Sequence, residues 1–123
     1  FMTRIFLTVV GVTYMLLAGY CSFLPSRASK VVGLSIQPGA GQSEFLTVYG
    51  GLEFGLGLLF LWPLLSSADT AFPLLACLLI HGALVLFRSA GFLMYAAIPP
   101  ATYQLAAGEW VFFLGSAYLY WRK

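Results

Sequence analysis

Three charged residues, Glu53, Arg88 and Glu109, lie within stretches of sequence that are otherwise apolar. An arginine beside two carboxylates can bind the polar end of a small molecule, because its guanidinium stays charged and has five hydrogen-bond donors. Two glutamates in unlike environments can also divide acid and base work in an enzyme, one of them protonated and the other ionised. Either chemistry requires elements that bring these residues together.

The composition indicates that those elements lie in a lipid bilayer. Of the 123 residues, 61% are hydrophobic and only 8% are charged, whereas about a quarter of the residues of a soluble domain are charged. The formal net charge of +2 comes from residues near the chain ends, and no run of Lys and Arg with interleaved aromatics predicts nucleic-acid binding. We therefore expect the lipid bilayer, and no nucleic acid, as a partner.

Four apolar segments are each close to the roughly 20 residues that cross about 30 Å of hydrocarbon. They cover about residues 5–24, 45–65, 72–95 and 101–121. Open strands would leave backbone groups unpaired in lipid, so helices are favoured. The sequence thus predicts an all-α, integral membrane four-helix bundle that forms a single domain over residues 1–123. The stretch 25–44, rich in Ser, Gly and Pro, is predicted to be a loop, which could cap a site or lie on the membrane surface.

Counting along these segments places the three charges at a similar depth. At 1.5 Å per residue, Glu53 and Glu109 lie roughly 12 Å, and Arg88 roughly 10 Å, from the same side of the membrane. A charge in hydrocarbon is costly and normally finds a partner in the bundle interior. We therefore expect Arg88 to bridge to Glu53, to Glu109 or to both.

Two further residues belong to the predicted ligand-binding site. Two ionised acids would outnumber one arginine, so either one glutamic acid stays protonated or a second cation takes part. His81 is that candidate cation, because it lies two helical turns before Arg88 on the same face. Tyr49 flanks Glu53 one turn away, where glycines either allow close packing of another helix or leave room for an apolar molecule. The site residues are therefore Glu53, Arg88, Glu109, Tyr49 and His81, with no catalytic residue assigned.

The sequence offers no set of metal ligands. One histidine and the two separated cysteines, Cys21 and Cys77, form no His/Cys spacing motif, and zinc sites need three or four such ligands. Counting also puts Cys21 and Cys77 too far apart across the bilayer for a disulfide. We predict no metal and no cofactor.

Several of these residues carry a resemblance to a known family. Ser43-Glu44-Phe45 leading into Tyr49-Gly50-Gly51-Leu52-Glu53-Phe54-Gly55-Leu56-Gly57, then Arg88-x-x-Gly91 and Glu109, resembles an uncharacterised family of small four-helix bacterial membrane proteins akin to the DoxX-like superfamily. The resemblance implies the four-helix fold. It also implies a link to respiratory or redox membrane assemblies or to chaperoning of membrane proteins, without roles for particular residues.

An even number of spans places both termini on one side. Arg4, Arg122 and Lys123 gather there, so the positive-inside rule predicts cytoplasmic termini. With the resemblance, this predicts a multi-pass protein of the bacterial inner membrane.

The predicted function is binding. We expect a protein that holds a lipid-like or apolar small molecule at the buried Glu/Arg/Glu site, or an accessory subunit of a homo-oligomer or a larger membrane complex. One alternative is a membrane enzyme that uses the paired glutamates for acid/base work on an apolar substrate. Another is a proton-coupled transporter that acts as a dimer, because buried carboxylates suit proton coupling. The sequence does not decide whether the protein is an enzyme.

Overall fold

The computed structural model describes residues 1–122, and these form helices without a strand. In chain order the elements are α1 (Met2–Phe23), α2 (Pro25–Val31), α3 (Ala40–Phe45), the π-helix η1 (Leu46–Leu52), α4 (Glu53–Ser66), α5 (Ala71–Met94) and α6 (Pro100–Trp121). The elements α3, η1 and α4 follow one another directly and form one continuous helical rod.

Three helical stretches in the described part of the chain are long and apolar enough to cross a membrane. They are Met2–Phe23, the rod Ala40–Ser66 and Ala71–Met94. These spans indicate a membrane protein. The fourth expected span, α6, is also 22 residues long, but it contains Gln104, Glu109 and several Tyr and Trp residues and is not among the strongly apolar helices.

The stretch 25–44 is not a simple loop, and the prediction there was wrong. Residues Pro25–Val31 form α2, and the second span begins at Ala40. Proline at the first helical position starts a helix without losing an intrahelical hydrogen bond, which explains Pro25. Gly39 (φ +79°) turns the chain into α3, and its backbone N–H donates to Gln42 Oε1 at 3.0 Å.

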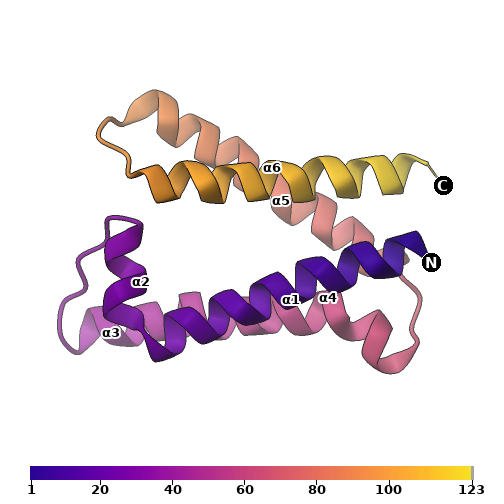
Figure 1. Ribbon diagram of the computed structural model, residues 1–123, viewed down its shortest axis with the longest axis horizontal. Coiled ribbons are helices and arrows are strands. Elements are labelled where there is room, and N and C mark those ends of the chain that lie inside the picture. Colours follow the sequence, from indigo (N-terminus) through magenta and orange to yellow (C-terminus); the bar gives the residue numbers. More distant parts are fainter. Residues whose placement is uncertain (123) are drawn as a thin grey trace.

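The first helix pair consists of α1 and the η1–α4 rod, which run antiparallel (Figure 1). Glycines allow their close approach: a Cβ on Gly11 would lie 2.6 Å from Leu61 Cγ, and one on Gly57 would lie 3.0 Å from Met15 Cγ. At the end of this pair, the Arg4 guanidinium donates to Pro63 O at 2.6 Å and to Ala68 O at 2.9 Å. Arg4 thus satisfies carbonyls that the end of α4 leaves free.

The second pair consists of α5 and α6, also antiparallel. Gly82 of α5 admits the Phe113 ring, whose Cε1 lies 3.2 Å from the position of a Cβ. Further along, the Phe92 and Tyr103 rings stack at 4.6 Å.

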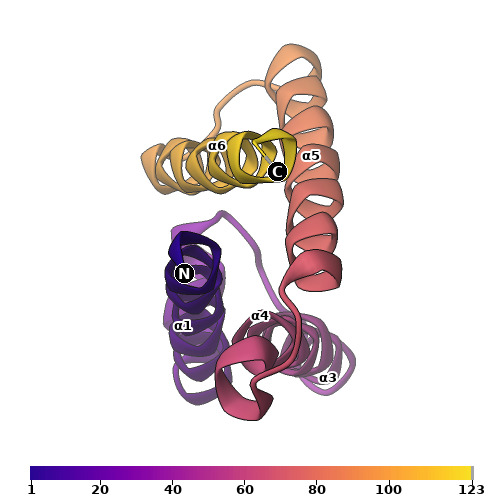
Figure 2. The same ribbon diagram turned by 90° about the vertical axis from the view of Figure 1, so that its right-hand side faces the viewer.

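The two pairs meet at an apolar core, and α5 is inclined relative to the other long helices. Figure 2 views the bundle from one end: α1 and α4 lie below, α6 lies above, and α5 runs along one edge from the level of α4 past α6. The buried core residues are Leu7, Val10, Tyr14, Phe60 and Cys77. At the C-terminal end of α1, the short helix α2 extends from the first pair toward the connection between α5 and α6 (Figure 1).

Candidate functional site

Arg88 and Glu109 form a bidentate ion pair between α5 and α6. Arg88 Nε donates to Glu109 Oε1 at 3.0 Å and Nη2 donates to Oε2 at 2.6 Å. Their side chains keep 31% and 14% of their surface exposed. Such a fork-to-fork arrangement fixes both side chains, and it is one of the pairings that the sequence predicted.

Glu53 takes no part in this ion pair, so the structure shows one pairing of the predicted Glu/Arg/Glu cluster and not the cluster itself. Among residues 1–122 the only ion pair is Arg88–Glu109, and Glu53 Oε2 is buried without a hydrogen-bond partner. The physical reason lies in the backbone just before Glu53. The π-helix η1 ends at Leu52, and its wider i→i+5 turns shift the faces of the rod away from those that α-helical counting predicts.

Glu53 is the first residue of α4, in the rod that packs against α1. Its side chain is half-buried, and among residues 1–122 no ion pair joins it to Arg88.

His81 forms no ion pair with Glu53 or Glu109 in the described part of the chain. It is fully buried, its Nε2 lies 2.8 Å from the Tyr14 hydroxyl, and its Nδ1 lies 2.7 Å from the Cys77 carbonyl oxygen. The carbonyl can only accept, so Nδ1 carries a proton, and in the neutral ring Nε2 then accepts from the Tyr14 hydroxyl. Cys77 Sγ also lies 3.4 Å from Nδ1.

Tyr14 is the residue that sequence reasoning missed. It is 8% exposed and links α1 to α5 through His81. The Tyr14 ring packs against two other rings: its centroid lies 5.9 Å from that of Phe60 and 5.7 Å from that of His81. A buried tyrosine usually finds a partner for its hydroxyl. A tyrosine in the first span and a lone histidine in the third could therefore have indicated this hydrogen bond from the sequence.

Tyr49, the fifth predicted site residue, lies on η1 and is 38% exposed. Its ring stacks on Phe45 with centroids 4.5 Å apart. No hydrogen bond joins Tyr49 to the Arg88–Glu109 pair in the described part of the chain.

Glycines near Glu53 leave one surface of the rod open. No atom lies within 4 Å of a Cβ built on Gly51 or Gly55. Beside Gly51, a groove of about 650 Å³ runs between α1 and the rod. It is lined by Met15, Ala18, Gly19, Ser22, Phe23, Leu46, Thr47, Gly50, Gly51 and Phe54.

Neither cysteine forms a disulfide: Cys21 and Cys77 are free and buried. Within residues 1–122, no three His, Cys, Asp or Glu side chains are grouped so that they could hold a metal ion. The polar groups of the site are therefore the carboxylates, the guanidinium, the imidazole and the phenols described above.

Comparison with known proteins adds no identity. No family model, no curated protein and no solved structure matches this chain. The resemblance to the DoxX-like superfamily remains a prediction that rests on the quoted residues.

Proposed function

We propose that this protein is a membrane-embedded binding protein that holds an amphiphilic or lipid-like molecule. The polar end of that molecule would lie at Glu53, Arg88 and Glu109, with Tyr49 at its side. His81 belongs to the ligand site only indirectly, because both of its ring nitrogens are engaged by Tyr14 and Cys77.

The observation that carries this proposal is the unpartnered Glu53 Oε2. A buried acceptor without a donor costs about 1–3 kcal/mol, and native proteins rarely leave such a group without a reason. A hydroxyl or amide group on a bound molecule would supply the missing donor.

The Arg88–Glu109 pair supports the same location. Its two charges neutralise each other, yet Arg88 remains 31% exposed, and Nη1 takes no part in its hydrogen bonds with Glu109. The headgroup that suits the site is therefore uncharged and can both donate and accept hydrogen bonds, as a hydroxyl does.

For the membrane arrangement, we propose that α6 is the fourth span of a four-helix bundle. Its 22 residues extend about 33 Å at 1.5 Å per residue, enough to cross the hydrocarbon. Its Glu109 is neutralised by Arg88, which reduces the cost of placing it in lipid. Both termini would then lie on the cytoplasmic side of a bacterial inner membrane.

The test is native mass spectrometry of the protein released from mild detergent, with identification of any retained small molecule. We expect the wild type to retain an amphiphile that Glu53→Gln/Glu109→Gln loses. Glu44→Gln is the matched control, because Glu44 is an exposed glutamate on α3. A wild type without a bound amphiphile, or equal retention by both variants, would contradict the proposal.

The same preparation separates the alternatives. Conversion of the retained molecule to a product would favour an enzyme, and proton-dependent uptake into liposomes would favour a transporter. A fixed protein partner that survives Glu53→Gln would favour an accessory subunit.

A further inference from the structure

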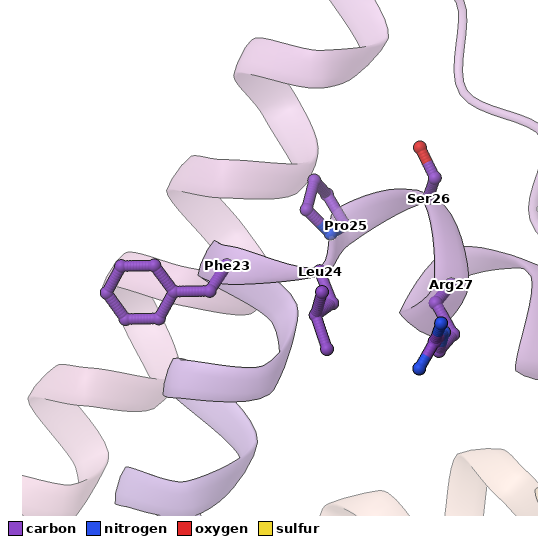
Figure 3. A pocket seen from close by; sticks show the side chains of 5 residues that line it. All are labelled: Phe23, Leu24, Pro25, Ser26 and Arg27. Atoms are coloured by element: carbon purple, nitrogen blue, oxygen red, sulfur yellow. The ribbon is translucent and has the colours of Figure 1, made fainter.

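The chain makes a sharp corner where α1 ends and α2 begins. Leu24, between the two helices, has φ −129° and ψ 57°, and Pro25 follows as the first residue of α2. The corner encloses a hollow of about 300 Å³ that is lined by Phe23, Leu24, Pro25, Ser26 and Arg27. In Figure 3 the Phe23 ring and the Arg27 guanidinium extend to opposite sides of this corner.

The short helix α2 has two unlike faces. Ala28 and Ser29 are buried against the bundle, whereas Ser26, Arg27 and Lys30 are exposed. Residues three and four apart in a helix lie on one face. The hydroxyl of Ser26 and the cations of Arg27 and Lys30 therefore share the outer face of α2.

These two cations have no acidic partner. Arg88 and Glu109 form the only ion pair among residues 1–122, and Glu44, the acid on neighbouring α3, pairs with neither Arg27 nor Lys30. Arg4 differs from them, because its guanidinium donates hydrogen bonds to the carbonyl oxygens of Pro63 and Ala68. Arg27 and Lys30 thus present unneutralised positive charge.

The corner also lies at the edge of the hydrocarbon. The 22 residues of α1 extend about 33 Å and just cross it, which places Phe23 at the boundary. Phe23 is 85% exposed and Leu24 is 44% exposed. Apolar side chains beside unpaired cations match a lipid molecule, which has acyl chains next to a charged headgroup.

We propose that the α1–α2 corner binds an anionic phospholipid. Arg27 and Lys30 hold its phosphate, Ser26 donates a hydrogen bond to a phosphate oxygen, and Phe23 and Leu24 lie along the upper part of its acyl chains. This site uses none of Glu53, Arg88 and Glu109, and neither proposed site requires the other.

The experiment is native mass spectrometry of the full chain in detergent that contains equal amounts of phosphatidylglycerol and phosphatidylcholine with the same acyl chains. We expect the wild type to retain phosphatidylglycerol preferentially. Each of Arg27→Gln and Lys30→Gln should weaken this retention about 5-fold, and the double variant about 30-fold, since a basic residue near an anionic membrane surface contributes on that scale. Raising the salt concentration should weaken it as well.

Arg122→Gln is the matched control, because Arg122 is an exposed cation at the other end of the bundle. We expect it to retain phosphatidylglycerol like the wild type. Equal retention of both lipids by the wild type, or an equal loss in Arg122→Gln, would overturn the proposal. Circular dichroism of each variant checks that its helices are intact, so that a loss of lipid reports the corner alone.

A soluble competitor distinguishes a lipid from a free phosphate. Millimolar glycerol phosphate should leave the bound phosphatidylglycerol in place, because it has no acyl chains to contact Phe23 and Leu24. Displacement by glycerol phosphate would mean that the corner recognises phosphate alone and would contradict the lipid site.

Discussion

Two polar regions lie inside this apolar bundle, and they differ in how well their hydrogen bonds are satisfied. Around His81, both ring nitrogens have partners, and the residue is fully buried. At Glu53, one buried carboxylate oxygen has no partner, and the Arg88–Glu109 pair is partly open. The first region joins α1 to α5, and the second comprises Glu53 on α4 and the ion pair between α5 and α6.

The contrast separates polar groups that serve the fold from those that are available to a ligand. A fully satisfied buried network rigidifies the arrangement of the elements that carry it. A buried group without a partner lowers the stability of the empty protein, and a bound molecule that completes the hydrogen bond recovers that free energy. This difference is why we propose a ligand at Glu53 and not at His81, although His81 is the more deeply buried residue.

The largest expected effect comes from breaking the ion pair of the open region. Arg88→Leu leaves the Glu109 carboxylate without its cation and should lower the free energy of unfolding by about 3 kcal/mol, the lower end of the range for buried pairs. Equilibrium unfolding in mixed detergent micelles measures this. Arg88→Leu/Glu109→Leu should regain most of the loss, since no charge is left unpaired. A double variant as unstable as the single one would mean that Arg88 acts through packing.

A smaller loss is expected in the closed region. His81→Leu removes the partners of the Tyr14 hydroxyl and of the Cys77 carbonyl, and should lower the free energy of unfolding by about 2 kcal/mol. Tyr14→Phe should add little to it, because both changes break the same hydrogen bond. Retention of the amphiphile should be unchanged. Additive losses, or loss of the amphiphile in His81→Leu, would remove the distinction between the two regions.

The smallest effect has the opposite sign. Glu53→Leu removes the unpartnered oxygen and should raise the free energy of unfolding of the ligand-free protein by about 1 kcal/mol. The same variant should no longer retain the amphiphile. Thermal unfolding after delipidation, followed by native mass spectrometry, tests both statements. If Glu53→Leu destabilises the protein as much as His81→Leu, then Glu53 has a structural role like that of the histidine.

Much of the helical architecture follows from local properties of the chain. Hydropathy depends only on neighbouring residues, so the strongly apolar stretches that begin near Met2 and Ala71 could be identified without knowing what they pack against. The residues that start α2 and α3, Pro25 and Gly39, are also local features of the chain. The stretch 25–44 around them is rich in Ser, Gly and Pro, as loops are, so α2 was not predicted.

The arrangement of the polar residues was harder to predict. Counting residues along a helix gives only the depth of a side chain in the membrane. Packing decides how far each helix is rotated about its axis and which helices lie beside it. The glycine contacts at Gly11 and Gly57 bring α1 against α4, and η1 changes the angle at which Glu53 projects.

The sequence by itself therefore determined that this is a helical membrane protein with charges in its spans, and that Arg88 needs a carboxylate partner. Only the tertiary structure decided that the partner is Glu109, that Tyr14 completes His81 and that Glu53 has an oxygen without a donor. The physical reason is that burial of a charge can be read from the residues around it in the chain. Its hydrogen-bond partner depends on which helix faces lie against each other, and that is a property of the whole bundle.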